Sequence, residues 1–251
     1  MLILLSPAKT LDMSPAEAGG TLPRMLADTH QLVDHLQQQS VSELGELMSI
    51  SEKLAELNYE RYQSFETDKP AGKAALLAFK GDVYQDLEAD DFTEREFAFA
   101  ERQIRILSGL YGLLRPSDLM QPYRLEMGTR LANDRGNSLY AFWDHRITDL
   151  LNEDLAEDGT GLVLNLASKE YFRSIQEDRL NGRILNIHFK ENRQGSYRII
   201  PFNAKKARGR MARLITLEGI RTAEPLRELV VNDYVFREDL SEENDWVYVR
   251  D

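Results

Sequence analysis

Short continuous apolar runs mark this chain, and such runs are typical of strands buried on both faces of a sheet. Strands of this kind are predicted at residues 2–5, 74–79, 162–168 and 184–189. Residues 197–200 follow the last run after a turn and are predicted to pair with it as a hairpin. Two more short strands, near residues 230–236 and 246–249, are expected at a sheet edge.

Other segments repeat their apolar residues every three or four positions, as amphipathic helices do. Helices are therefore predicted at residues 23–66, 93–107, 137–151 and 204–215, with a helical turn at 170–172. The first segment holds two or three short helices and ends at Pro70-Ala71-Gly72. Capping-box spacing marks two helix starts, Ser40 with Glu43 and Thr93 with Glu96.

Length and composition set the domain organisation that these elements can form. The chain has 251 residues, of which 42% are hydrophobic, enough for one sizeable core. No composition break, internal repeat or low-complexity tract marks a domain boundary. We therefore expect a single domain over residues 1–251, of mixed α/β class, with a central mixed sheet flanked by helices.

Several classes of protein are disfavoured by what the sequence lacks. Without cysteine there are no disulfides, no cysteine metal sites and no thiol redox sensing. No apolar run approaches the ~20 residues of a membrane span, and no basic segment precedes the first run as in a signal peptide. We expect a soluble, cytoplasmic protein, monomeric and without a membrane partner. The net charge of -11 means that any cationic surface must be local.

Polar side chains that suit a ligand follow three of the predicted strands. Lys9 lies in the turn after the first strand, Lys80 and Asp82 follow the second, and Asn165 and Ser168 close the third. Ligands of α/β proteins often bind at the carboxyl ends of strands, so these groups predict a pocket for a nucleotide or phosphorylated molecule. The alternative is that Lys9 is merely solvated and Lys80 pairs with Asp82 in a turn.

Residues 104–128 combine glycines, prolines, arginines and tyrosines at unusual density. These are Gly109, Gly112, Gly128, Pro116, Pro122, Arg115, Arg124, Tyr111 and Tyr123. Glycine permits left-handed backbone or the close approach of another group, and proline fixes φ and stops helices. Two interpretations follow: a rigid packing corner between a helix and a strand, or a hairpin that brings backbone N–H groups close to phosphate.

A cluster of positive charge occupies the predicted helix near the carboxyl end of the chain. It consists of Lys205, Lys206, Arg208, Arg210 and Arg213, with no acidic residue between positions 202 and 217. At 100° per residue, Lys206, Arg210 and Arg213 form a stripe opposite an apolar face. The stripe is either a solvated face or, because like charges repel without a counter-ion, an anion site. The anion site is our expectation.

Five long motifs in this chain resemble those of the YaaA family, bacterial proteins linked to resistance to peroxide stress. The motifs are LILLSPAKTLD (2–12), LAFKGDVY (77–84), ILSGLYGLLRPSDLMQPYRLEMG (106–128), LNLASKEYF (164–172) and AKKARGRMAR (204–213). The resemblance implies an α/β fold of unusual topology with a positively charged cleft. It further implies DNA binding through a helix-hairpin-helix-like element, here matched to residues 108–112, and a role in limiting iron-dependent oxidative damage under hydrogen peroxide.

The expected function is therefore non-sequence-specific, salt-dependent binding of DNA, duplex or locally unpaired, in the peroxide response. The expected DNA- or anion-binding residues are Lys9, Lys80, Ser108, Gly109, Tyr111, Gly112, Arg115, Tyr123, Arg124, Lys205, Lys206, Arg208, Arg210 and Arg213. The tyrosines at 111, 123 and 171 either stack on unpaired bases or pack in the core. No cofactor is expected.

Two other functions remain open at this point. One is an enzyme acting on a nucleotide or phosphorylated small molecule in a cleft that contains Lys9 and Lys80, although no catalytic constellation is recognisable. The other is an iron-binding protein, which would depend on carboxylate ligands because the chain has no cysteine and only four histidines. No metal site is expected from the spacing of those residues.

Overall fold

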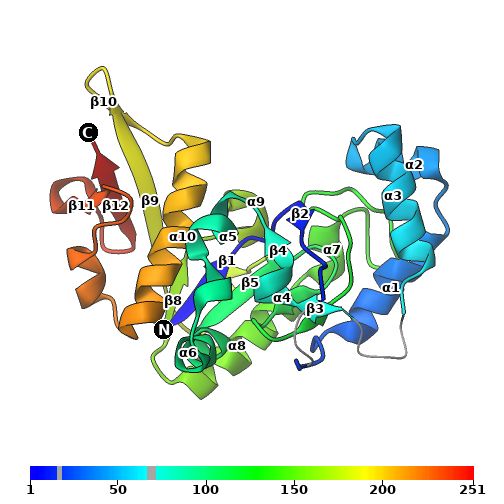
Figure 1. Ribbon diagram of the computed structural model, residues 1–251, viewed down its shortest axis with the longest axis horizontal. Coiled ribbons are helices and arrows are strands. Elements are labelled where there is room, and N and C mark those ends of the chain that lie inside the picture. The colour runs from blue at the N-terminus through cyan, green and yellow to red at the C-terminus, as the bar shows by residue number, and fades with distance from the viewer. Residues whose placement is uncertain (16–18, 67–71) are drawn as a thin grey trace.

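An eight-stranded mixed sheet is the central layer of the computed structural model, which describes residues 1–15, 19–66 and 72–251 (Figure 1). The strand order is β11-β12-β9-β8-β1-β5-β6, and β10 pairs with β9. Their bounds are β1 Leu2–Leu5, β5 Ile104–Ser108, β6 Gly112–Leu114, β8 Leu162–Asn165, β9 Arg183–Arg193, β10 Ser196–Arg198, β11 Val235–Phe236 and β12 Asp245–Arg250. The mixed α/β fold predicted from the apolar pattern is confirmed.

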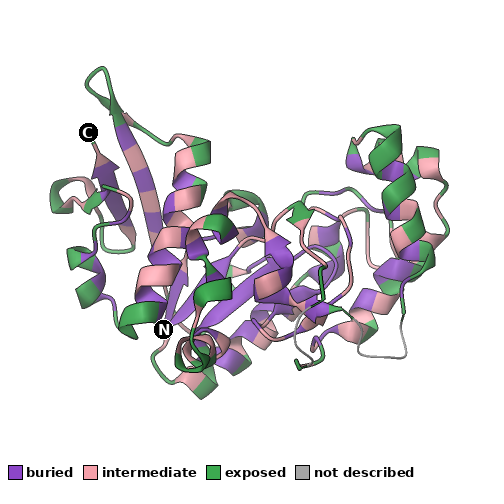
Figure 2. Cartoon of the chain, in the orientation of Figure 1, coloured by how far each residue is buried: buried purple, intermediate pink, exposed green. Residues whose placement is uncertain are grey.

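Strand β1 lies inside this sheet and pairs in parallel with β5 on one side and β8 on the other. Ile3 is the register partner of both Ile104 and Leu164. All four residues of β1 are completely buried, because both faces of a parallel strand are covered by other elements. The continuous apolar run at residues 2–5 is therefore a strand buried on both faces, as predicted. Figure 2 shows the middle of the sheet as buried.

Helices pack along the sheet, and three of them form the end of the molecule opposite β9 and β12 (Figure 1). They are α1 Leu26–Gln37, α2 Val41–Met48, α3 Glu52–Gln63, α4 Ala75–Ala78, α5 Asp82–Leu87, α6 Glu94–Gln103, α7 Leu139–Trp143, α8 Arg146–Asp158, α9 Lys169–Phe172 and α10 Pro201–Glu218. Short 3-10 helices occupy 89–91, 177–179, 224–228 and 238–240. Helices α1 to α3 gather at one end, whereas α10 lies beside α5 and β9 nearer the other. None of the described helices is long and apolar enough to cross a membrane.

Local signals in the sequence predicted several element boundaries well. Both capping boxes form, with the Ser40 and Thr93 hydroxyls accepting from the backbone N–H of Glu43 and Glu96. The β9–β10 hairpin, the helical turn at α9 and the short strands β11 and β12 are also confirmed. Only β11 is at the sheet edge as expected, because β12 pairs with β11 on one side and with β9 on the other. Of the predicted break after the first helices, Pro70 and Ala71 lie outside the described residues.

Three predicted elements differ from the structure. Residues 74–79 are mostly helix α4, between the short strands β3 (Lys73–Ala74) and β4 (Phe79–Lys80), because burial on all sides suits either conformation of an apolar run. Helix α6 ends at Gln103, and the next residues form β5. The helix expected at 137–151 is interrupted between α7 and α8, where Asp144 has a positive φ of 45°.

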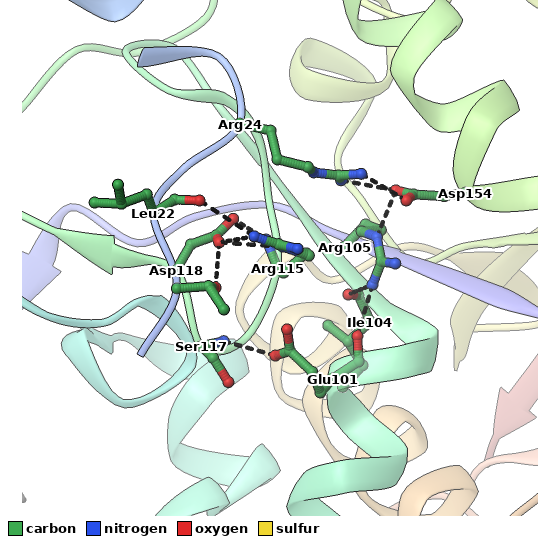
Figure 3. Close-up of polar contacts among 10 residues, drawn as sticks. Leu22, Arg24, Glu101, Ile104, Arg105, Arg115, Ser117, Asp118 and Asp154 are labelled. Carbon is green, nitrogen blue, oxygen red and sulfur yellow. Dashed lines mark hydrogen bonds and ion pairs between the residues drawn. The ribbon is translucent and has the colours of Figure 1, made fainter. Parts of the chain in front are cut away.

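A buried ion network joins the sheet to two helical segments (Figure 3). The Asp154 carboxylate on α8 accepts from Arg105 Nε on β5 at 2.6 Å. Arg24, just before α1, donates to both oxygens of the same carboxylate at 2.7 and 2.8 Å. Asp154 is only 3% exposed, and these three guanidinium N–H groups replace water around its carboxylate.

Candidate functional site

A cavity of about 330 Å³ opens at the carboxyl ends of β1 and β8, and we call it the strand-end cleft. It is bounded by the turn after β1, the start of α5, residues 123–126, the segment after β8 and one side of α10. Its ionisable lining consists of Lys9, Lys80, Asp82, Tyr84, Tyr123, Arg124, Glu126, Glu170, Tyr171, Lys205 and Arg208. The cleft thus lies where ligands of α/β proteins usually bind.

Backbone pairing brings the first two lysines together. The short strand β2 (Thr10–Leu11) pairs antiparallel with β4, with Thr10 as the register partner of Lys80. Lys9, adjacent to Thr10, extends its ammonium to 3.0 Å from Glu126 Oε1. Lys80 forms an ion pair with Asp90 rather than with its sequence neighbour Asp82. The structure therefore places both lysines in one cleft, as expected from their positions after predicted strands.

The turn after β1 is held by hydrogen bonds from two separate segments. Ser6 Oγ accepts from the backbone N–H of Ser168 at 2.8 Å, and Tyr84 donates to the Ser6 carbonyl oxygen at 2.9 Å. Burial raises the pKa of the Tyr84 phenol, which stays protonated and keeps this bond. The turn is consequently tied to α5 and to the segment after β8, and Lys9 starts from a fixed backbone.

Helix α10 contributes Lys205 and Arg208 to the strand-end cleft. Arg208 is half-buried, its Nε has no hydrogen-bond partner, and burial lowers the pKa of its guanidinium. The close approach of α10 to α5 depends on Gly209, because a Cβ built there would lie 1.8 Å from the Val83 carbonyl oxygen. Gly209 therefore allows the adjacent Arg208 to reach the cleft.

The cationic stripe of Lys206, Arg210 and Arg213 does not line the cleft. Lys206 Nζ lies 3.9 Å from Asp86, and Arg213 Nε lies 3.2 Å from Glu88. Arg213 also donates to the carbonyl oxygens of Leu87 and Glu88 at 3.1 and 2.7 Å. The expectation that this stripe is an anion site is corrected: its counter-charges come from α5 and the residue that follows it.

Arg210 belongs to a separate surface pocket shared with Asp86, Glu88 and Asp233. Arg210 therefore lines a pocket that is rich in carboxylates and lies outside the strand-end cleft. Of the five cations counted in the sequence, Lys205 and Arg208 are therefore the two that the fold directs into the strand-end cleft.

Residues 104–114 form a β-hairpin of β5 and β6, with Ser108 opposite Gly112, and not a helix-hairpin-helix. Ser108 and Tyr111 are buried, and a Cβ at Gly109 would lie 2.2 Å from the Leu125 carbonyl oxygen. Trp143 Nε1 donates to the Gly109 carbonyl at 3.0 Å. The prediction that Ser108, Gly109, Tyr111 and Gly112 present N–H groups to DNA is wrong, because protein atoms fill that space. The packing interpretation is the correct one.

A tight connection between consecutive helices does occur elsewhere, between α2 and α3. Ser49 takes a left-handed backbone conformation with φ of 51°, and the N–H of Ile50 donates to the Gly45 carbonyl at 3.0 Å. Helix α3 then begins at Glu52 after Ser51. The sequence offered a capping signal for α2 here, but not a glycine-rich hairpin.

The second half of the 104–128 stretch does reach the cleft. Tyr123 and Arg124 line it, and Tyr123 shares a hydrogen bond of 2.6 Å with Ser108 Oγ. Burial raises the pKa of the Tyr123 phenol, so it remains neutral. Tyr62 of α3 donates to the Arg124 carbonyl at 2.6 Å, which ties this segment to the helical end of the molecule.

Arg115 does not extend the positive cleft, contrary to the expectation from sequence. Its guanidinium pairs with the buried carboxylate of Asp118 at 2.8 and 3.1 Å, and Asp118 also accepts from the Arg115 backbone N–H (Figure 3). Thr21 donates to the same carboxylate at 2.6 Å. Arg115 is thus a structural residue of the turn after β6.

The lining residues that the sequence reasoning missed include four with polar or ionisable side chains, Ser6, Tyr84, Glu126 and Glu170. Each lies within or next to one of the motifs quoted above. Their closeness in sequence to Lys9, Asp82 or Arg124 could have identified them as site residues. Glu126 is the most consequential, since it lies within ion-pair distance of both Lys9 and Arg124, at 3.0 and 3.2 Å. Within residues 1–15, 19–66 and 72–251, no group of three or more histidines and carboxylates is arranged to hold a metal ion.

Comparison with known proteins agrees with the motifs around the cleft. Residues 1–240 match the family described as "Peroxide stress protein YaaA". A UPF0246 protein of Acaryochloris marina (strain MBIC 11017) is 49% identical to this chain over 253 aligned residues, which cover all of both chains. A family match over nearly the whole chain, together with a full-length relative of this identity, establishes that the chain belongs to the YaaA family of peroxide stress proteins.

Proposed function

We propose that this protein acts in the peroxide stress response by binding DNA without sequence preference, with the strand-end cleft contacting phosphates. The observation that carries the proposal is the convergence of five cations on one cleft: Lys9, Lys80, Arg124, Lys205 and Arg208. Three carboxylates line the same cleft and Asp90 pairs with Lys80, so five cations face four carboxylates on a chain whose net charge is -11. A local positive site on an acidic body attracts a polyanion only there.

Phosphate contacts of this kind position a protein on DNA but carry no sequence information. Each neutralised phosphate releases counter-ions, so the logarithm of the binding constant falls with the logarithm of salt by about 0.9 per contact. Binding is therefore expected to weaken steeply between about 50 and 200 mM salt and to be equal for duplexes of unrelated sequence.

The test is a salt titration of a short labelled duplex by fluorescence anisotropy. Replacing Lys205 and Arg208 by glutamine is expected to lower the salt slope by about 1 to 2, because up to two phosphate contacts are lost. The matched control replaces Lys206 and Arg210, which lie on the same helix but outside the cleft. No binding at low salt, or equal losses in both variants, would overturn the proposal.

The proposal includes a protective role against iron-dependent oxidative damage to DNA. The chain has no cysteine, so it cannot sense peroxide through a thiol and acts downstream of a sensor. Wild-type protein is expected to slow strand cleavage of plasmid DNA by ferrous iron and hydrogen peroxide, and the Lys205/Arg208 variant is expected to protect less. Equal protection by both proteins would show that protection of DNA does not depend on the strand-end cleft.

A second candidate is an enzyme acting on a nucleotide, which the position of the cleft at the strand ends favours. The serine hydroxyls at those strand ends, Ser6 and Ser168, hydrogen-bond to each other at 3.3 Å. Among the described contacts neither bonds to an imidazole or carboxylate that would activate it. DNA binding is the better supported function, and loss of any nucleotide turnover in Lys9→Ala would be the test of the enzyme.

A further inference from the structure

The strand-end cleft is a small cavity rather than a broad groove. Its volume of about 330 Å³ is close to the lower limit of the roughly 300–1,000 Å³ that small-ligand sites occupy. The base pairs of a duplex cannot enter such a space, so a fully paired duplex can contact the cleft only through phosphates at its opening. A single nucleotide is of the right order of size.

Three buried polar atoms of the cleft have no hydrogen-bond partner. They are Arg124 Nε, Arg208 Nε and Glu126 Oε1, and they make up three of five such atoms among the described residues. Lys9 and Arg124 approach Glu126 Oε1 within ion-pair distance, but neither meets hydrogen-bond geometry at that oxygen. Since buried polar groups are almost always satisfied, their concentration in one cavity points to a ligand that completes them.

The chemistry of these atoms defines the ligand. The two arginine nitrogens are donors and require an anionic acceptor, for which phosphate is the best match. Glu126 Oε1 is an acceptor and requires an N–H or O–H donor. A phosphodiester backbone offers acceptors only, so it satisfies the arginines and supplies no hydrogen-bond donor to Glu126 Oε1. The donor that DNA can supply is a base N–H, as when a carboxylate accepts from an exocyclic amine.

Aromatic rings form part of the same cavity. Tyr84 and Tyr123 line it, and their hydroxyls are already bonded, to the Ser6 carbonyl and to Ser108 Oγ. Each ring is only 5% exposed and packs against another ring, Tyr84 against Phe79 and Tyr123 against Tyr111. The two tyrosines therefore form part of the rigid wall of the cavity.

We propose that the strand-end cleft holds one unpaired nucleotide, with its phosphate at Arg124 and Arg208 and a base N–H donated to Glu126. The inference rests on the DNA binding proposed above and deepens it, because it makes an extruded nucleotide the preferred feature of the DNA. A free mononucleotide carries the same phosphate and base, and the experiment separates the two sources.

The test compares three duplexes in anisotropy measurements at one salt concentration. One is fully paired, the second carries a single bulged adenine, and the third carries an abasic site at the bulge. The bulged adenine is expected to bind about 10-fold more tightly than the abasic bulge, because both have the extra phosphate and only one has the base. Competition by dAMP at millimolar concentration against the bulged duplex measures whether a free nucleotide binds in the cleft.

Two variants at one position test the role of the acceptor. Glu126→Met removes the acceptor at similar size and is expected to reduce the 10-fold preference to about 1, while the fully paired duplex still binds. Glu126→Gln retains an acceptor oxygen and is expected to keep the preference. A preference that survives in Glu126→Met overturns the assigned role of Glu126 and with it the proposal.

The outcomes distinguish this inference from the function on which it rests. Binding of all three duplexes with equal affinity would overturn the nucleotide site and leave DNA binding intact. Binding of dAMP that is lost in Arg208→Gln, without binding of any duplex, would support the nucleotide site and overturn DNA binding. If neither DNA nor dAMP binds, both proposals fail.

Discussion

Lys9 Nζ lies 3.0 Å from Glu126 Oε1, so a cation of the turn after β1 is paired with a carboxylate from the far side of the strand-end cleft. Lys9 is 65% exposed, and an exposed ion pair is weak. A phosphate can therefore compete with Glu126 for Lys9. The carboxylate of Glu126 and a bound phosphate therefore compete for the same ammonium group.

Replacement of Glu126 by glutamine is expected to tighten binding of a fully paired duplex by roughly 5-fold, because Lys9 becomes free to contact phosphate. The salt slope should steepen by about 0.9 for that one added contact. Anisotropy titrations at several salt concentrations measure both quantities. The control is Glu170→Gln, since Glu170 lines the same cleft but accepts from the Gly128 N–H. Weaker binding in Glu126→Gln would mean that Glu126 positions Arg124 and does not compete with DNA.

The Asp154 carboxylate is expected to be indispensable to the fold. Asp154→Asn leaves Arg105 and Arg24 without their counter-charge, and breaking a buried pair in this way typically costs about 3–5 kcal/mol in the free energy of unfolding. Denaturant unfolding measures the loss. The matched control, Asp239→Asn, removes an exposed partner of Arg237 and should change stability little. Equal effects of the two substitutions would contradict the structural role of the network.

Acid is expected to unfold the protein through the same carboxylate. Burial alone would raise the pKa of Asp154, but hydrogen bonds from Arg24 and Arg105 outweigh it and hold the pKa below its ordinary value of 3.8. A lowered pKa means that the stabilisation is complete above 3.8 and is lost as the pH falls through the folded-state pKa.

Unfolding measured from neutral pH down to about pH 2 should therefore show a stability loss beginning near the ordinary pKa of a carboxyl group. The curve for Asp154→Asn should be flatter by the contribution of this one group. A wild-type curve with no dependence on pH in this range would show that the network does not gain from ionised Asp154.

The packing of α10 on α5 is expected to depend on Gly209. Gly209→Ala places a methyl group 1.8 Å from the Val83 carbonyl oxygen, and the required backbone shift should cost about 3 kcal/mol, the upper end for overpacking. Arg208 should move with the helix, so DNA binding should fall as well. Thermal or denaturant unfolding and anisotropy measure the two effects.

Another helical glycine provides the control for that substitution. A Cβ at Gly45 in α2 would meet its nearest atom, Ala55 Cβ, at 3.6 Å, which is ordinary contact. Gly45→Ala should therefore stabilise the protein by about 0.5–1 kcal/mol through the lower entropy of the unfolded chain. Stabilisation by Gly209→Ala as well would refute the close approach of the two helices.

The local pattern of the sequence was enough to predict an element whose conformation depends only on the residues of that element. The run at residues 2–5 specified a buried parallel strand, and the spacing from Ser40 to Glu43 specified a helix start. The same reasoning failed at residues 74–79, because an apolar run buried on all sides fits a helix as well as a strand. It also failed at Ile104 and Leu107, whose helical spacing continues that of α6 although both lie in β5.

The sequence by itself determined which residue types are available for the site: lysines after predicted strands, a cluster of cations on one helix, and a stretch rich in glycine and proline. Only the tertiary structure decided which cations of α10 line the strand-end cleft. Asp86 and Glu88 lie far earlier in the chain, yet they neutralise Lys206 and Arg213 and leave Arg208 to the cleft. Electrostatic pairing depends on distance in space, and the pattern of one segment contains no information about charges that another segment brings to it.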